Sequence, residues 1–370
     1  MTASSAIDPA RQKPVAIWLF AVAGLVALMV LVGGATRLTD SGLSITEWAP
    51  VTGAVPPLGA EAWAAEFEKY KAIPEYERVN AGMSLEEFKF IYWWEWGHRF
   101  LGRLIGLAFA VPMLIFFLTR RLGPADAPVV LGLFVLGGLQ GVVGWWMVAS
   151  GLVDRVDVSH YRLTAHLSLA LAIFGALLWV GANYARRSGL WTAPTTETDD
   201  PAFAGPAAAA LAAGVFVQIA LGALVAGLRA GKTYNTWPLM DGSFVPAGYF
   251  AEPGRPLSFL ESMGGVQFNH RLGAYILCAG ALAFAVAVFR SGTGPRLRRQ
   301  AALLGGLVVV QSALGIWTVL AAAPLALGLA HQAGALALFA VALSIVFDHR
   351  QGDRGFGLFN GRPARVQGVE

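Results

Sequence analysis

Long apolar stretches alternate with short polar segments along most of the chain. The first clean stretch runs from Val15 to Ala35. Seven more follow, at about Phe100 to Leu118, Val129 to Val148, Leu163 to Tyr184, Ala207 to Leu228, Leu272 to Phe289, Ala301 to Ala321 and Leu325 to Phe347. Each is close to the ~20 residues that a helix needs to cross the hydrocarbon layer of a membrane. The pattern predicts an all-α polytopic membrane protein with eight transmembrane helices.

The composition excludes a soluble globular protein. Of the 370 residues, 56% are hydrophobic and only 14% are charged. The net charge of +4 is explained by basic residues at the membrane surface, so it gives no reason to expect a nucleic-acid partner. A single cysteine, Cys278, rules out an intrachain disulfide and a thiolate metal cluster, and we expect it to be a small packing residue.

Basic residues gather at every second connection between the predicted helices, which is typical of cytoplasmic connections. We therefore expect both termini on the cytoplasmic side, and the long connections Thr36 to Ile91 and Arg229 to Val266 on the outer side. The polar start, Met1 to Pro14, leads into an apolar run that is too long for a cleaved signal peptide. The basic residues are Arg11 and Lys13 before the first helix, Arg120 and Arg121 after the second, Arg186 and Arg187 after the fourth, Arg290, Arg296, Arg298 and Arg299 after the sixth, and Arg350 and Arg354 after the eighth.

One short motif occurs twice. Glu95-Trp-Gly-His-Arg99 reappears as Gln267-Phe-Asn-His-Arg271. In each copy a glutamine and then a second histidine follow at similar intervals: Gln140 and His166 in the first, Gln311 and His331 in the second. The segment Gly42 to Trp48 before the first copy is echoed by Gly231 to Trp237 before the second. The repeat predicts two tandem pseudo-symmetric four-helix bundles, at about 1–190 and 191–370, that face the same way across the membrane.

The four histidines of the repeat lie at one depth. Each is followed, after 19 to 22 residues, by the first arginine at the inner end of its own helix. At ~1.5 Å of rise per residue, that distance is about one hydrocarbon thickness. His98, His166, His270 and His331 are therefore expected near the outer face, two in each half and all on even-numbered helices.

Paired imidazoles between facing helices favour axial ligation of haem iron, because bundle cores commonly hold cofactors in this way. Ionisable residues inside a membrane are functional by default, which disfavours four separate structural histidines. Zinc is less favoured, because no carboxylate or thiolate lies at ligand spacing on the same helices apart from Glu95. His160, in the short outer connection before the fourth helix, and His349, in the inner tail, fall outside the set and are expected to be solvated surface residues.

The two halves differ at one chemically important position. Glu95 lies three residues before His98, whereas Gln267 holds the same place before His270. An amide cannot shuttle a proton, so the asymmetry assigns catalysis to the first half. A salt bridge from Glu95 to Arg99 or Arg103 is the alternative. For Arg99 and its counterpart in the second half, contact with haem propionates and simple snorkelling to the interface are both open.

Several of these motifs together resemble the haem A synthase family, and the resemblance spans nearly the whole chain. They are Gly33-Gly-Ala-Thr-Arg-Leu-Thr-Asp-Ser-Gly-Leu-Ser44, Glu95-Trp-Gly-His-Arg99, Asn235-Thr-Trp-Pro-Leu-Met240, Asn269-His-Arg271 and His331-Gln332. The resemblance implies an enzyme of the bacterial inner membrane that oxidises the C8 methyl group of haem O to the formyl group of haem A, for use in cytochrome oxidase. Some members carry a cysteine pair in the first outer loop, but residues 36–91 of this chain contain no cysteine.

By the same resemblance, His98 and His166 mark the site of the substrate haem O, and Glu95 is the catalytic carboxylate. His270 and His331 are implied to hold a resident haem b, with Arg99 and Arg271 close to the two cofactors. A prenyltransferase that makes haem O and cytochrome oxidase assembly factors are the implied partners. Two other functions compete: a dihaem b-type membrane cytochrome in electron transfer, and a haem chaperone. The equal depth of the two sites disfavours the cytochrome, and the difference between Glu95 and Gln267 disfavours the chaperone.

Overall fold

The computed structural model describes residues 9–191, 200–252 and 254–353. Eight long helices there are long and apolar enough to cross a membrane, which confirms the predicted fold class. Two short helices, α2 (Gly59–Lys71) and α3 (Pro74–Arg78), lie between the first two long ones. The long helices are α1 (Lys13–Leu38), α4 (Leu85–Leu118), α5 (Ala127–Val148), α6 (His160–Arg187), α7 (Ala204–Gly227), α8 (Met263–Arg290), α9 (Pro295–Leu320) and α10 (Leu325–Asp353).

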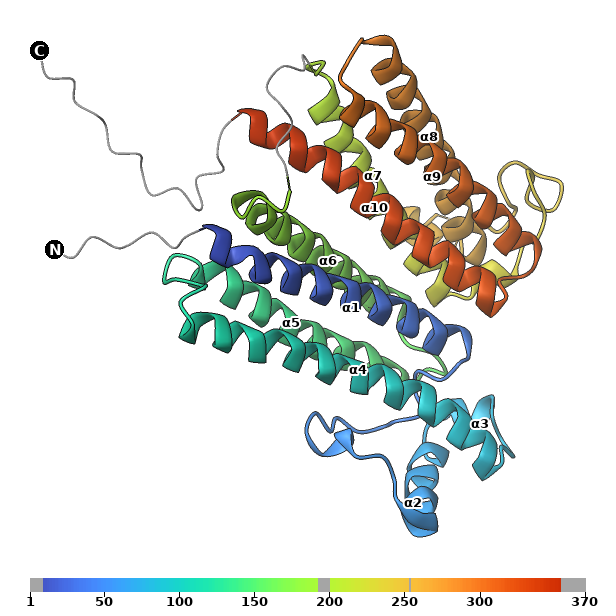
Figure 1. The fold of residues 1–370 in the computed structure, drawn as a ribbon. Coiled ribbons are helices and arrows are strands. Elements are labelled where there is room, and N and C mark those ends of the chain that lie inside the picture. Colours follow the sequence, from blue (N-terminus) through green and yellow to red (C-terminus); the bar gives the residue numbers. More distant parts are fainter. Residues whose placement is uncertain (1–8, 192–199, 253, 354–370) are drawn as a thin grey trace, which may run out of the picture.

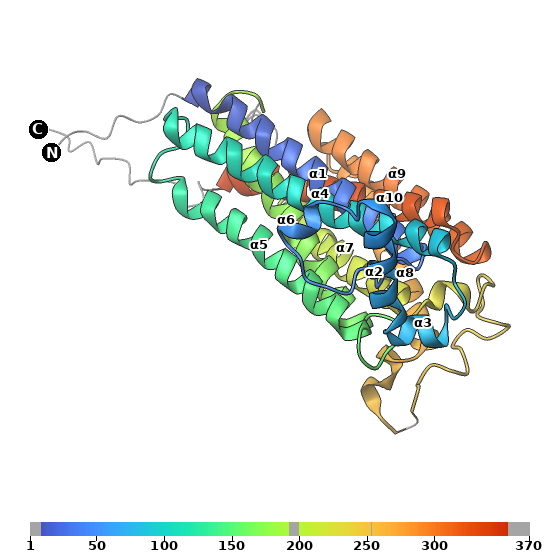
Figure 2. The same ribbon diagram turned by 90° about the horizontal axis from the view of Figure 1, so that it is seen from below.

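The long helices form two groups of four. Helices α1, α4, α5 and α6 pack against one another, as do α7, α8, α9 and α10; we call these groups the N-terminal unit and the C-terminal unit. Helices α1 and α6 contact α7 and α10 and so join the units (Figure 1). The start of α1 and the end of α10 lie at one end of the molecule, and α2 and α3 lie at the other (Figures 1 and 2). The arrangement fits the predicted tandem bundles, and the division into domains at about residue 190 stays a prediction.

Small residues let α7 approach its neighbouring helices closely. Ala204, Ala208 and Ala212 recur every four residues on α7 and are almost fully buried. A four-residue spacing places them on one face of the helix. Since lipid tails are as apolar as leucine, close packing of small faces, more than burial of large side chains, holds transmembrane helices together.

The two units also share their turns at the ends of α1 and α7. Helix α1 ends at Leu38 and α7 ends at Gly227, and two residues later the backbone turns left-handed in both units. The residues in this conformation are Asp40, with φ of 51°, and Arg229, with φ of 53°. The connections after α1 and α7, which we call the outer segments after their predicted side of the membrane, therefore begin with the same change of direction, as their echoed sequences suggest.

Helix α4 starts much earlier than its apolar stretch predicted. The expected span began at about Phe100, but α4 begins at Leu85, so the connection expected from Thr36 to Ile91 ends inside a helix. Ser84 and Glu87 form a capping box: the Ser84 hydroxyl accepts from the Glu87 N–H, and the Glu87 carboxylate accepts from the Ser84 N–H. The polar first turns lower the local hydropathy, which hid the true start. Of the predicted inner basic residues, Arg354 lies outside the described residues.

A second, smaller core lies outside the helix bundle. It is formed by α2, α3, the first turns of α4 and the ends of neighbouring connections. Phe67 stacks on Phe88 with ring centroids 4.9 Å apart, and Tyr70 packs against the same ring at 5.3 Å. Aromatic packing of this kind gives the outer segment a stable shape of its own.

Glu75 is buried in this outer core. Its carboxylate accepts a hydrogen bond from the Tyr70 hydroxyl, and that hydroxyl accepts one from the side-chain amide of Asn80. Burial raises the pKa of Glu75 from 4.5 to about 8. Folding therefore takes up a proton between these two values, and the stability of the outer segment falls as pH rises from about 4.5 to about 8.

Glu75→Gln is expected to remove that pH dependence, because the amide is neutral at every pH and keeps the same shape. Hydrogen exchange of residues 67–80, measured between pH 5 and pH 9 and corrected for intrinsic rates, checks this. In the parent, protection should weaken with rising pH, and in the variant it should stay level. Glu77→Gln, an exposed change on the same helix, is the control and should behave like the parent. An unchanged slope in Glu75→Gln would contradict the assignment.

Candidate functional site

Each of the four repeat histidines faces a glycine on the preceding long helix. Gly33 of α1 faces His98 of α4, and the same pairing recurs three more times. A Cβ added to the glycine would lie 2.8 to 3.2 Å from the imidazole Cε1 in every pair, so a larger residue requires the ring or the backbone to shift. The other pairs are Gly144 with His166, Gly222 with His270 and Gly315 with His331. The protein thus has four similar sites in which a histidine lies against a glycine, one in each consecutive pair of long helices. We call each of these sites a histidine seat.

A glutamine one turn before the glycine supports three of these histidines. The amide nitrogens of Gln140, Gln218 and Gln311 lie 3.0 to 3.1 Å from Nδ1 of the facing imidazole. Each also donates to the backbone oxygen of the same histidine, at 2.7 to 3.0 Å. Contact of this kind orients the ring, and the same amide turned by 180° would bring its oxygen to accept from Nδ1–H, which leaves Nε2 to bind a metal.

The two histidines of the C-terminal unit face each other. The ring centroids of His270 and His331 are 6.3 Å apart, and the ring planes are nearly perpendicular, at 78°. Two metal–imidazole bonds of about 2 Å, together with the radii of the two rings, span about this distance. The pair therefore fits one iron ion between two axial imidazoles.

The surrounding groups also fit haem iron. The side-chain oxygens of Gln140, Gln218 and Gln311 are buried and have no hydrogen-bond partner among the described residues. An imidazole that binds iron through Nε2 carries its proton on Nδ1 and needs such an acceptor. The described residues hold no group of three or more histidine, cysteine, aspartate or glutamate side chains that could bind a metal ion.

Glu95 is buried and binds the outer segment that follows α1. Its Oε2 accepts hydrogen bonds from the Ser44 hydroxyl and the Ile45 N–H, both at 2.8 Å. Its Oε1 forms a 2.6 Å ion pair with Arg99, one turn further along α4. The alternative considered from the sequence, a salt bridge to Arg99, is therefore present, while Arg103 binds the backbone oxygens of Ala49 and Pro50 instead.

Gln267 makes the corresponding contact with opposite polarity. Its amide nitrogen donates to the backbone oxygens of Ala230 and Thr233, at 2.9 and 2.7 Å. In the N-terminal unit the outer segment presents donors to this position, and a carboxylate accepts them. The C-terminal unit presents carbonyls, and an amide donates to them. The difference between Glu95 and Gln267 therefore follows the local backbone, which offers donors to one and carbonyls to the other. A difference in catalytic role is a separate reason for the same change.

Arg99 and Arg271 hold the outer segments in the same way. Arg99 donates to the backbone oxygens of Ile45 and Glu47, and Arg271 donates to those of Tyr234 and Thr236. The two residues whose carbonyls bind Arg271 follow the two that bind Arg99 by the same number of positions in the sequence. The repeat seen in the sequence is therefore also a repeated contact. These bonds differ from simple snorkelling, since they direct each guanidinium into protein.

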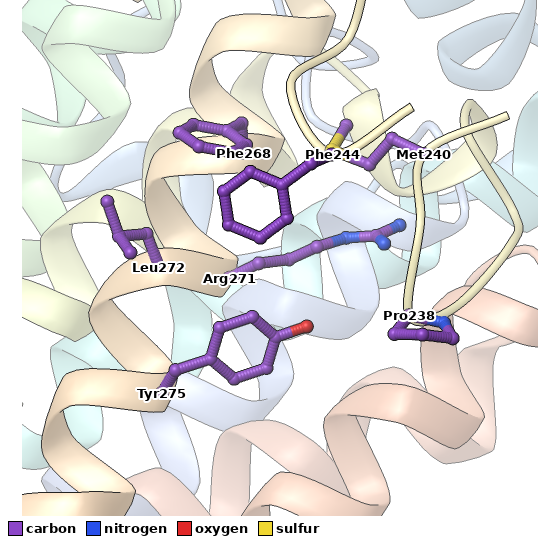
Figure 3. Close-up of a pocket in the computed structure, with 7 residues that line it drawn as sticks. All are labelled: Pro238, Met240, Phe244, Phe268, Arg271, Leu272 and Tyr275. Carbon is purple, nitrogen blue, oxygen red and sulfur yellow. The ribbon is translucent and has the colours of Figure 1, made fainter. Parts of the chain in front are cut away.

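A small pocket lies beside Arg271. The Arg271 side chain runs from α8 between the rings of Phe244 and Tyr275 and points toward the segment that carries Pro238 and Met240 (Figure 3). The Nε of Arg271 is buried without a hydrogen-bond partner among the described residues. Contact with a haem propionate remains a prediction for both arginines. The unpaired Nε of Arg271 supports it for that residue, whereas the Nε of Arg99 already donates to Glu95.

Ion pairs close the outer junction between the units. Asp157, in the connection between α5 and α6, binds Arg37 at 2.9 Å and Arg229 at 2.8 Å. Arg229 also pairs with Asp40 at 3.1 Å. Arg37 further donates to the last carbonyls of α7, those of Ala226 and Gly227. Arg37 and Asp40, which belong to the segment Gly33–Ser44, therefore tie the end of α1 to the C-terminal unit.

Two histidines lie in different surroundings from those predicted. His160 is the first residue of α6 and is buried, only 6% exposed, against the end of α7. His349 lies within α10 and pairs with Asp200 at 3.3 Å, with a side chain that is 13% exposed. The prediction of solvated surface histidines was wrong for both, because the helices extend past the ends of the apolar stretches.

The pairing of glutamine and glycine against each histidine was not predicted: Gln140 and Gln311 were recognised as parts of the repeat without a role, and Gln218 was not recognised. The signal for this pairing is a glutamine four residues before a glycine on an otherwise apolar helix, at Gln140, Gln218 and Gln311. Such a glutamine needs a partner inside a membrane, but the sequence does not say which histidine it faces.

Comparison with known proteins places the chain. The COX15-CtaA family model, described as cytochrome oxidase assembly protein, matches residues 16–343. The chain belongs to this family. A protein named heme A synthase from Parvibaculum lavamentivorans is 53% identical over 334 residues, which cover 90% of this chain and 94% of that protein. Proteins of the same name from Chelativorans and Caulobacter are each 51% identical, over 94% and 92% of this chain and 94% and 97% of theirs.

Membership in this family gives the duplicated histidine frame a context. The matched residues include all four histidine seats and both copies of the motif. The described helices make the chain a multi-pass membrane protein, as the family match and the eight apolar helices indicate together.

Proposed function

We propose that this chain oxidises the C8 methyl group of haem O to a formyl group and so makes haem A. One observation carries the proposal: two nearly identical histidine frames differ at the acidic position, with buried Glu95 in one and Gln267 in the other. The relatives named heme A synthase, at about half identity over most of the chain, support the reaction. In this assignment His98 and His166 hold the substrate, and His270 and His331 hold a resident haem b.

The oxidation half-reaction is R–CH₃ + H₂O → R–CHO + 4 H⁺ + 4 e⁻, which passes through an alcohol and a hydrated aldehyde, and the four electrons pass to an external oxidant. Glu95 is positioned one turn from His98 to accept protons from the methyl group or from the attacking water. Arg99 keeps this carboxylate in place through its ion pair, and the outer segment after α1 covers it. The haem b in the C-terminal unit supplies one-electron redox chemistry when bound.

The membrane orientation completes the proposal. Both termini lie on the cytoplasmic side of the bacterial inner membrane, and the four histidine seats, α2 and α3 lie toward the outer face. The basic inner connections support this orientation. A prenyltransferase supplies haem O, which is too apolar to diffuse freely through water, and cytochrome oxidase assembly consumes haem A.

The test is to purify the protein from cells that supply haem O, extract the bound haems and identify them by chromatography and mass. Haem A together with its hydroxymethyl intermediate is the expected result. Haem b alone would favour a dihaem electron-transfer cytochrome, and unchanged haem O would favour a chaperone. Either of these outcomes overturns the proposed reaction.

A further inference from the structure

One of the four histidine seats lacks the support that the other three share. Gln140, Gln218 and Gln311 each contact a histidine from one turn before the facing glycine. On α1 the same position, four residues before Gly33, is Met29. The Met29 side chain takes a place beside α4 similar to the place of Gln218 beside α8. Cε of Met29 lies 3.4 Å from a Cβ added to Gly102 of α4, and the Gln218 oxygen faces Gly273 of α8.

The consequence for His98 is visible in its hydrogen bonding. The Nδ1 of His98 is buried and has no hydrogen-bond partner among the described residues, with the thioether of Met29 out of hydrogen-bond contact as well. Nδ1 of each of the other three repeat histidines lies beside a glutamine amide. The two units therefore differ at a second position, close to iron, besides Glu95 and Gln267.

An acceptor on the outer nitrogen of an imidazole, such as a glutamine side-chain oxygen turned toward Nδ1, strengthens the bond of the ring to a metal. It fixes the orientation of the ring and raises the basicity of the ligating nitrogen, and its loss typically costs about 10- to 100-fold in metal affinity. His98 has neither effect from a side chain. His166, the other histidine of the N-terminal unit, is oriented by Gln140, and it gains the second effect when the Gln140 oxygen, which has no other partner among the described residues, turns to accept from Nδ1–H.

We propose that Met29 makes His98 the weak, exchangeable ligand among the four histidines, so that haem leaves the N-terminal unit by breaking its bond to His98 first. This inference rests on the proposed function, in which His98 and His166 hold a haem that must be released after each turnover. The C-terminal unit, where both histidines have a glutamine partner, keeps its haem. Met29 is a positioning residue in this account, acting through His98.

The experiment uses the purified holoenzyme and measures haem transfer to excess apomyoglobin, with the released haems identified by mass. Farnesylated haem reports the N-terminal unit and haem b reports the C-terminal unit. Met29→Gln should slow release of farnesylated haem by about 10- to 100-fold and leave release of haem b unchanged. Gln218→Met, the reciprocal change, should speed release of haem b by a similar factor. Met29→Leu, which fills the space without an acceptor, should release haem at the parental rate.

A spectroscopic readout distinguishes an absent bond from an ineffective one. When Met29→Gln accepts a hydrogen bond from His98, the more basic imidazole favours ferric iron, and the midpoint potential of the N-terminal haem should fall. The proposal is overturned if Met29→Gln lowers the midpoint potential, which shows that the hydrogen bond has formed, but releases farnesylated haem at the same rate as Met29→Leu. If Met29→Gln does not accumulate, Gln218→Met decides alone, and parental release of haem b overturns it.

The proposed function fails in a different way. In that case the parental protein carries no farnesylated haem or leaves it unconverted, which the first extraction reveals before any variant is made. Release rates for haem b in the parent and in Gln218→Met still report whether a glutamine partner controls retention at a histidine seat.

Discussion

Glu95→Gln is expected to lower the conversion of haem O to haem A by at least about 100-fold while the bound haem is retained. An amide cannot accept a proton, and loss of a general base typically costs 10²- to 10⁴-fold in rate. Single-turnover conversion of bound haem O, followed by extraction and mass, measures the effect. Haem occupancy in the same samples shows whether the histidine frame is intact.

The contacts of Glu95 require a control for its structural role. The carboxylate also holds the outer segment through Ser44 and Ile45 and pairs with Arg99, so the amide, which loses the ion pair, would weaken that hold even if Glu95 had no part in the chemistry. Ser44→Ala removes one of these bonds and keeps the carboxylate. If Glu95→Gln and Ser44→Ala loosen residues 41–48 to the same extent in hydrogen exchange and slow conversion equally, Glu95 is an anchor and the base assignment is wrong.

Gly144→Ala is expected to remove haem from the N-terminal unit alone, and Gly315→Ala from the C-terminal unit alone. The added Cβ would lie 2.8 Å from Cε1 of His166 in the first variant and 2.9 Å from Cε1 of His331 in the second. Contacts this short require the imidazole to move away from the glycine, and we expect this displacement to weaken its hold on the haem. Haem content per protein, separated into farnesylated haem and haem b, should fall severalfold for one class and stay level for the other.

Matched controls exist on the same two helices. Gly141 of α5 and Gly306 of α9 have open space where a Cβ would be added. Alanine at either position should preserve both haems, because alanine also favours the helix by about 0.5 to 1 kcal/mol over glycine. Equal haem loss in Gly141→Ala and Gly144→Ala would mean that general helix packing, rather than the histidine seat, controls occupancy.

Much of the fold could be predicted because its signals are strong and local. Eight apolar runs of membrane-spanning length can hardly form anything except helices when most of the chain is hydrophobic. A His-Arg pair is costly in such helices, so its duplication around His98 and His270 is conspicuous in the amino-acid sequence. The echo between Gly42–Trp48 and Gly231–Trp237 is equally visible there, and the fold adds its reason, since Arg99 and Arg271 bind matching carbonyls in the two segments.

The remaining features depend on packing between helices. Hydropathy placed the start of α4 near Phe100, because the capping box at Ser84 and the polar turns that follow it carry no apolar signal. The same effect left His160 and His349 outside helices that in fact contain them. The glutamine partners of three histidines emerge only when consecutive helices are placed side by side, and the odd position of Met29 has meaning only in comparison with them.

The central claim is that one duplicated frame holds a substrate in the N-terminal unit and a resident haem in the C-terminal unit. The most direct measurement extracts and identifies the haems bound to purified parental protein, His166→Ala and His331→Ala, all from cells that supply haem O. The account predicts that His166→Ala keeps haem b and loses haem O and haem A, whereas His331→Ala loses haem b. Loss of the same haem in both variants, or haem b in both units of the parent, would contradict it.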